Sequence, residues 1–288
     1  MLTFIVNPAA GSGHAQKIEG QIRAELERRG ISAAFLRTEN PGHATELARE
    51  AAAKPDCTGV IAVGGDGTCY EVACGLMGSS VPMGIIPAGT GNDFIKSVNI
   101  PKKPLAALEL VLKGEARPVD VGRMNERLFL NVSGTGFDVT VLDFTLSAKK
   151  YCKGILPYLI GLVRAIRHYR PIHMRFTADG VTQERDVLIC SIANGRYFGG
   201  GIRICPEAKP DDGYFDLVVV ENKPRWMIPF YLPGLLFGRV LKFSFTTHQR
   251  VQQVRLESQG MRLNMDGEIF PMDAAEYSIL QGELRLFW

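Results

Sequence analysis

The chain has 288 residues, of which 46% are hydrophobic and 22% are charged. Such a length corresponds to roughly two domains of about 150 residues each, and the hydrophobic content excludes global disorder and a collagen-like chain. The formal net charge of +3 is too small to indicate nucleic-acid binding, so we expect no nucleic-acid partner.

The first part of the chain alternates short apolar strands with amphipathic helices. Strands are predicted at 2–7, 32–38, 59–63 and 83–87, and helices at 16–30, 43–54 and 68–77. The apolar run at 59–63 is typical of a strand buried on both faces. This alternation predicts an N-terminal α/β domain, residues 1–115, built on a parallel sheet with helices on both faces.

After residue 115 the pattern changes to short β-rich segments separated by turn residues. They lie at 117–124, 127–134, 173–180, 187–195, 214–221, 240–248, 252–260, 261–267 and 277–282. This pattern predicts a C-terminal antiparallel β-sandwich, residues 116–279, with one helical insertion at 157–170. We expect residues 280–288 to return to the first domain and the site to lie in a cleft between the two domains.

Three strands of the first domain end in turns of small residues: NPAAGSG (7–13), GGDGT (64–68) and PAGTGND (87–93). In a parallel sheet all three turns meet at the carboxyl edge, where ligands bind in open α/β folds. Glycine lets the backbone approach a phosphate closely, and helix N-termini supply free N–H groups. The three turns together predict a phosphate-binding site.

Asp66 lies between glycines in the second turn. It is either the N-cap of the following helix or a ligand of a nucleotide-bound Mg²⁺. The turns contain no GxxxxGK[ST] and no lysine, which excludes a P-loop and leaves charge neutralisation to Mg²⁺ and backbone dipoles.

In combination, NPAAGSG, GGDGT and PAGTGND resemble the diacylglycerol kinase catalytic-domain family, in its bacterial lipid kinase branch. The resemblance continues through VDVG (119–122), NVSGTGFD (131–138), IANGRYFGGG, PDDGYFDL and NMDGE (264–268). It implies a phosphofructokinase- or NAD kinase-like α/β domain, a β-sandwich, and an ATP-dependent, Mg²⁺-dependent lipid kinase that phosphorylates diacylglycerol or a similar lipid alcohol. An NAD kinase-like enzyme and a non-catalytic nucleotide- or lipid-binding homologue are the alternatives.

The resemblance also implies the positions that would contact ATP. These residues are Asn7, Pro8, Ala9, Ala10, Gly11, Thr38, Gly64, Gly65, Asp66, Gly67, Thr68, Glu71 and Thr90.

A structural Mg²⁺ site is implied around PDDGYFDL. Asp212 would supply its side chain, Lys209 and Tyr214 their carbonyls, and Asp120 a carboxylate linked through water. Asp211 remains an alternative to Asp212, and an Asp-Asp-Gly sequence is also a common turn.

The family's catalytic segment corresponds to NMDGE, where Glu268 would accept the proton of the lipid hydroxyl. Asp266 is the alternative base, and DG is also a hairpin-turn signal. Asp66 and Glu268 would have to converge across the cleft.

Ten basic residues and no acidic residue lie in two segments, 146–170 and 223–242, which also hold the longest apolar runs. Those runs are too short for a membrane-spanning helix. Basic residues beside apolar ones indicate attachment to an anionic membrane surface, although two solvated amphipathic helices would look similar. Six scattered cysteines without a CxxC pair fit neither a zinc site nor a disulfide framework, and the histidines show no ligand spacing. We expect a cytoplasmic protein, peripheral at the membrane, whose oligomeric state is left open, a homodimer included.

Overall fold

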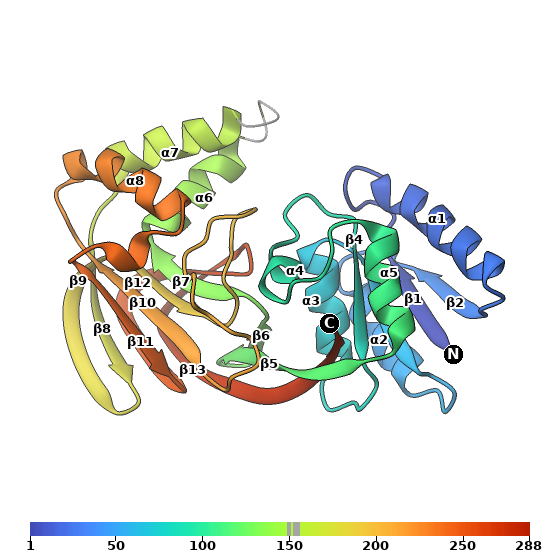
Figure 1. Cartoon of the computed structure of the whole chain (residues 1–288). Helices are drawn as coiled ribbons and strands as arrows, with labels where there is room; N and C mark the ends of the chain where they lie inside the picture. Colours follow the sequence, from blue (N-terminus) through green and yellow to red (C-terminus); the bar gives the residue numbers. More distant parts are fainter. Residues whose placement is uncertain (149–150, 152–155) are drawn as a thin grey trace. The chain divides into compact units, whose positions relative to one another are not determined.

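The computed structural model describes residues 1–148, 151 and 156–288. It divides into two compact units (Figure 1). The first contains Met1–Val121, Pro210–Gly213 and Leu280–Trp288, and the second contains Gly122–Lys209 and Tyr214–Ile279. The predicted classes, a parallel α/β fold followed by an antiparallel β-rich fold with a helical insertion, are confirmed.

The first unit is built on a parallel sheet with the order β4-β3-β1-β2. Its elements in chain order are β1 (Leu2–Val6), α1 (His14–Arg28), β2 (Ala33–Arg37), α2 (His43–Ala52), β3 (Gly59–Gly64), α3 (Asp66–Leu76), β4 (Met83–Pro87), α4 (Asp93–Ser97), α5 (Pro104–Lys113) and the start of β5 (Ala116–Met124). Beside β4 lies the end of the last strand, where Leu286 is in parallel register with Met83.

The central strands form as predicted because they are apolar throughout. All six residues of β3 and all five of β4 are buried. Helices α1 and α5 pack on one face of the sheet, where Ile18, Ile22 and Leu108 meet Phe4 and Ile61. Helices α2 and α3 pack against each other and against the sheet (Figure 1). Helix α1 ends just before Gly30, which has a φ of 67°, a backbone conformation that glycine adopts readily.

The second unit is an antiparallel β-structure with the strand order β11-β10-β9-β7-β12-β13, in which β8 pairs with both β9 and β12. Its elements are β6 (Arg127–Phe129), β7 (Val132–Gly136), α6 (Phe137–Ala148), α7 (Leu156–His168), β8 (Ile172–Ala178), β9 (Val181–Ala193), β10 (Phe215–Glu221), η1 (Arg225–Met227), α8 (Ile228–Leu236), η2 (Val240–Lys242), β11 (Thr246–Val251), β12 (Gln253–Met265) and β13 (Glu268–Phe287).

Two apolar cores result from the alternation of side chains along β9 and β10. One core is formed by side chains of strands alone and contains Phe129 of β6, Phe176 of β8 and Phe215 of β10. The other lies between the sheet and the helices, where Val218 and Val220 meet Ala165 of α7. Figure 1 shows α6, α7 and α8 gathered on the same side of these strands.

The strand predicted at 240–248 is wrong in its first half. Residues 240–242 form the short helix η2, and strand β11 begins only at Thr246. The physical reason is aromatic packing: Phe243 and Phe245 stack on each other and both contact Tyr231 of α8. The alternating apolar residues of this segment suggest a strand, but in the fold their side chains pack against helix α8. Helices α4, α5 and α6 were not predicted, and a helix at 223–242, where α8 lies, was expected only as the alternative to a membrane-attachment segment.

Candidate active site and relatives

The three small-residue turns of the first unit meet at the carboxyl edge of the parallel sheet. Asn7, which follows β1, donates from Nδ2 to the Thr68 hydroxyl at 3.2 Å, so the first turn is tied to the second. The amides of Ala88 and Gly89 donate to the Gly64 carbonyl at 2.7 and 3.1 Å, so the second turn is tied to the third. The predicted convergence of these turns is therefore present in the fold.

Glycine is required where the turns touch. A Cβ added at Gly89 would lie 2.4 Å from the Cα of Gly65. A Cβ added at Gly11 would lie 2.2 Å from the Ala88 carbonyl oxygen, at a φ of 60°. Both distances are far below van der Waals contact, so these backbones approach each other only because no side chain separates them. The resulting edge consists mainly of backbone, which suits the close approach of phosphate groups.

Asp66 caps a helix, but a different helix from the one it starts. It is the first residue of α3, whose N-cap is Gly65 without a side-chain cap bond. Its Oδ1 instead accepts the amides of Asp93 and Phe94, which open α4, at 2.7 and 3.2 Å. The interpretation of Asp66 as the N-cap of its own helix is wrong, because its side chain reaches the next turn of the edge.

A second carboxylate lies beside Asp66. Burial raises the pKa of the Asp66 carboxyl, and the negative charge of Asp93 raises it further. Asp93 is itself buried and pairs with Lys96 at 2.6 Å. Two neighbouring carboxylates that repel each other are a set that a divalent cation stabilises. Asp93 was missed as a site residue, although the last letter of PAGTGND is a visible signal for it.

The remaining residues that were predicted to contact ATP differ in their surroundings. Thr38 follows β2 and donates its amide to the Val6 carbonyl at 2.9 Å, so it lies at the same sheet edge. Thr90 is exposed on the third turn. The Glu71 carboxylate accepts the Ala44 amide at 3.1 Å, at the N-terminal end of α2. Glu71 therefore holds two helices together, in addition to any contact with a ligand.

The segment around Asp212 is anchored by Asp120. The Asp120 side chain is 1% exposed, and its two oxygens accept the amides of Gly213 and Gly282 at 2.7 and 2.8 Å. Its own amide donates to the Pro210 carbonyl at 2.8 Å. An aspartate in an apolar strand is costly to bury without partners, and here backbone amides supply them. Asp212 is half-buried in this turn, whereas Asp211 is exposed.

In the second unit, Asp266 and Gly267 form the hairpin turn between β12 and β13, with φ values of 48° and 99°. The Asp266 carboxylate accepts the amides of Leu130, Asn131 and Val132 at 2.7 to 3.1 Å. Glu268 is the first residue of β13, and its side chain is exposed. Of the two candidate bases, Asp266 is occupied by structural bonds and Glu268 faces solvent.

Comparison with known proteins gives a family match for each of the two parts of the chain. Residues 1–124 match the family described as the diacylglycerol kinase catalytic domain. Residues 131–288 match the YegS C-terminal NAD kinase beta sandwich-like domain.

Relatives extend over nearly the whole chain. A diacylglycerol kinase of Mycobacterium tuberculosis is 30% identical, over 99% of this chain and 94% of its own length. A probable YegS-like lipid kinase of Pseudomonas aeruginosa is 34% identical, over 94% of this chain and 89% of its own length. A crystal structure of a diacylglycerol kinase homologue from Bacillus anthracis superposes with a TM-score of 0.81 at 27% identity, covering 100% of this chain and 97% of that one.

The fold, the glycine turns and these relatives define the class of the protein, which is a two-unit lipid kinase. The chain belongs to the diacylglycerol kinase catalytic-domain family. Among the residues that the structure describes, no helix is long and apolar enough to cross a bilayer.

Proposed function

We propose that the chain transfers the γ-phosphoryl group of ATP to the hydroxyl of diacylglycerol or a similar lipid alcohol in a Mg²⁺-dependent reaction. The observation that supports this most strongly is the meeting of three glycine turns beside the Asp66–Asp93 pair. Phosphoryl transfer needs positioning and charge stabilisation more than covalent chemistry. A backbone-lined edge with two carboxylates meets both needs.

In this proposal, the amides of the turns around Asn7, Gly65 and Gly89 bind the phosphates of ATP. Asp66 and Asp93 would hold Mg²⁺, which neutralises charge on the phosphoryl oxygens. The amides of Asp93 and Phe94 donate to Asp66 Oδ1 and thereby fix the direction of its carboxylate. Carboxylates that are held in place before the ion binds lower the cost of ordering the site when ATP binds.

Glu268 is the proposed general base, which takes the proton of the lipid hydroxyl as the oxygen attacks phosphorus. Its exposure leaves the carboxylate open to a substrate, whereas the acceptor positions of Asp266 are used by three amides. Asp266 then positions the turn that carries Glu268. The approach of Glu268 to Asp66 stays a prediction of this mechanism.

A second Mg²⁺ with a structural role is proposed at Asp212, with the carbonyls of Lys209 and Tyr214. The amide bonds of Asp120 support this proposal because they hold the backbone of the turn in place. A partly hydrated oxygen site of this kind suits Mg²⁺.

The test of the reaction is phosphoryl transfer from radiolabelled ATP to a panel of acceptors in mixed micelles. The panel contains diacylglycerol, phosphatidylglycerol, a simple lipid alcohol and NAD. We expect label in one organic-extractable lipid, and only when Mg²⁺ is present. Transfer to NAD alone, or to no acceptor, would refute the lipid-kinase assignment.

Two conservative variants separate binding from chemistry. Glu268→Gln should lower kcat by about 10²- to 10⁴-fold, the usual contribution of a general base, and leave the melting temperature unchanged because the side chain is exposed. Asp66→Asn keeps an oxygen for the amides of Asp93 and Phe94, so it should fold and lose Mg²⁺-dependent activity. Wild-type turnover in Glu268→Gln would exclude Glu268 as the base.

We also propose that the second unit binds an anionic membrane surface through η1 and α8. Trp226, Phe230 and Phe237 are 70%, 75% and 78% exposed, and Trp226 lies edge-on to Phe230. Arg225, next to Trp226, is exposed and donates to the Arg167 carbonyl at the end of α7 at 3.2 Å.

Helix α7 continues this surface. Leu159 and Val163 are 51% and 57% exposed, beside the exposed basic residues Arg164 and Arg167. Large apolar side chains next to basic groups suit the boundary of an anionic bilayer, where each basic group contributes about 1 kcal/mol. Lys149, Lys150 and Lys153, which the sequence places in the same basic segment, lie outside the described residues.

Sedimentation with vesicles tests this surface. Binding to vesicles that contain phosphatidylglycerol should exceed binding to neutral vesicles, and Trp226→Ser with Phe230→Ser should abolish the difference. Val181→Ser is the control, because Val181 is 62% exposed at the start of β9. Equal binding to neutral and anionic vesicles, or equal loss in the control, would refute the membrane surface while leaving the kinase reaction intact.

A further inference from the structure

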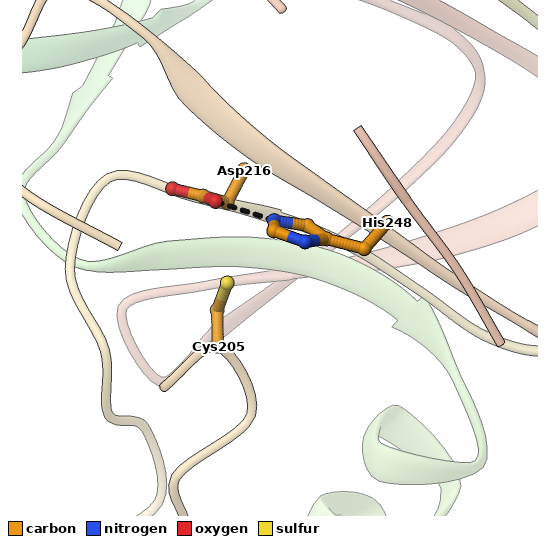
Figure 2. Close-up of side chains that lie close together, drawn as sticks. All are labelled: Cys205, Asp216 and His248. Atoms are coloured by element: carbon orange, nitrogen blue, oxygen red, sulfur yellow. Dashed lines mark hydrogen bonds and ion pairs between the residues drawn. The ribbon is translucent and has the colours of Figure 1, made fainter. Parts of the chain in front are cut away.

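Three different metal-ligating side chains meet inside the second unit, and none of them is a residue assigned above to nucleotide or lipid. They are Cys205, Asp216 and His248, and their ligand atoms all lie within 4.8 Å of one another. Figure 2 shows the Cys205 sulfur pointing toward the carboxylate of Asp216 and the ring of His248, which are joined by a hydrogen bond of 2.5 Å.

Sheet register brings Asp216 and His248 together. In the antiparallel pair β10–β11, Asp216 is opposite Arg250, and Val218 is opposite His248. Asp216 and His248 are therefore diagonal neighbours on one face of the sheet. Val218 shows which face this is, because its side chain is buried in the core between the sheet and the helices.

The connection between β9 and β10 supplies Cys205, which packs with Ile204 and Ala208 in the same core. Arg196 fixes this connection by donating to the Ala208 carbonyl at 2.9 Å. The site is closed to bulk water on most sides, since Cys205 is 0% and Asp216 2% exposed. His248 is half-buried and forms its open side.

The surroundings of the sulfur act in two directions. The backbone of Glu207 and Ala208 lowers the pKa of the Cys205 thiol, whereas burial and the negative charge of Asp216 raise it more strongly, so the pKa of the thiol is raised overall. A metal ion supplies the positive charge that would let this sulfur ionise.

We propose that Cys205, Asp216 and His248 form a site for Zn²⁺ or a similar borderline-soft divalent ion, with water in the fourth position. One thiolate, one imidazole and one carboxylate are the donors that Zn²⁺ takes at distances of about 2.0–2.3 Å. Mg²⁺ takes oxygen donors and would not select this set. Binding releases the thiol proton. The Nε2 proton between His248 and Asp216 is released from a protonated ring or moves to Nδ1 in a neutral ring, and the ion replaces their hydrogen bond.

The ion would tie the β9–β10 connection to strands β10 and β11. Because these strands and Cys205 all belong to the second unit, the expected consequence of metal binding is a more stable second unit, with no part in the phosphoryl-transfer chemistry. Spacing rules for zinc sites do not find this arrangement, because the three ligands are separated by 11 and 32 residues and share no local motif.

Cobalt binding to the untagged, chelator-treated full chain tests the proposal. We expect one equivalent of Co²⁺ to produce a thiolate-to-cobalt charge-transfer band together with the intense visible bands of a tetrahedral ion. Cys205→Ser should remove the charge-transfer band, and His248→Gln should weaken Co²⁺ binding by more than about 100-fold. Cys57→Ser is the matched control, because Cys57 is a free thiol of the first unit and should leave the spectrum unchanged.

A second measurement covers the case in which the variants fail to fold. Zn²⁺ at low micromolar concentration should raise the melting temperature of the wild-type chain and of Cys57→Ser, and the same concentration of Mg²⁺ should not. The proposal is overturned if the wild-type chain binds no Co²⁺ with a thiolate band, if the band persists in Cys205→Ser, or if Zn²⁺ produces no shift. The cluster would then be a metal-free hydrogen-bond network around a buried aspartate.

Discussion

Replacing Asp266 by asparagine tests whether this carboxylate supports the turn before β13 or performs chemistry. Asparagine has the same size and tolerates the positive φ of 48°, but one acceptor oxygen becomes an NH₂ group that can only donate. At best the remaining oxygen keeps the two bonds that Oδ1 makes to Asn131 and Val132. The amide of Leu130 then loses its bond of 2.7 Å to Oδ2.

The cost follows from the burial of the donors. Leu130, Asn131 and Val132 are 2%, 4% and 3% exposed, so water does not readily replace the lost acceptor. An unsatisfied buried donor costs about 1–3 kcal/mol, and a bond to a charged group contributes about 1.5–3 kcal/mol. We therefore expect Asp266→Asn to lower the local free energy of opening by about 2 kcal/mol, and Asp266→Ala by more.

Hydrogen exchange measured by mass spectrometry reports this region directly and avoids the separate unfolding of two units. A loss of about 2 kcal/mol corresponds to roughly 30-fold faster exchange of the amides at 130–132. Turnover should fall only to the extent that the turn is disordered. Glu268→Gln is the reference, with unchanged exchange and greatly reduced turnover. Unchanged exchange in Asp266→Asn together with a loss of turnover as large as in Glu268→Gln would show that Asp266 is the base.

Three further predictions concern other parts of the chain. Gly89→Ala should melt at lower temperature and lose ATP affinity, because its Cβ would lie 2.4 Å from the Cα of Gly65. Gly20→Ala in α1 is the control: its Cβ meets nothing within 4 Å, so it should be neutral or stabilising by about 1 kcal/mol. Equal effects of the two variants in isothermal titration and in melting would contradict the account of the turns. Burial raises the pKa of Asp138 from 3.8 to about 6. The folded state therefore holds this proton more tightly than the unfolded state, and the stability of the fold falls as the pH rises through 6. In urea unfolding, Asp138→Asn should be more stable than wild type by about 1–3 kcal/mol at pH 8 and should show no gain at pH 4. Asp120→Ala removes the carboxylate that accepts the amides of Gly213 and Gly282 and should cost about 2–4 kcal/mol. It should also raise the Mg²⁺ concentration needed for half-maximal activity, and a normal Mg²⁺ dependence would separate Asp120 from the metal.

Local patterns in the sequence were sufficient to predict the strands of the parallel sheet and the glycine turns at its carboxyl edge. A parallel strand buried on both faces must be apolar throughout, and a backbone that approaches a phosphate or another backbone must be glycine. Both requirements are visible in β3, β4 and the turns that follow them. For the same reason the antiparallel class of the second unit was predictable from short alternating segments.

Helix α6 was not predicted, and α8 was predicted only as an alternative, because their composition imitates strands or loops. Helix α6 is rich in β-branched and aromatic residues, and α8 contains a proline inside it, at Pro233. They are helical because they cover an apolar sheet face, where Val141 and Leu235 pack into the core. Tertiary packing outweighs local propensity in such segments.

The partners of the carboxylates in the candidate sites were decided only by the tertiary structure. Asp66 meets Asp93 across two strand ends, Asp266 meets amides more than 130 residues earlier in the chain, and Asp216 meets His248 through sheet register. Residue type and local spacing determine what chemistry a side chain offers. Which groups surround it depends on strand order and register, and these are set by the burial of the whole sheet rather than by any neighbouring residue.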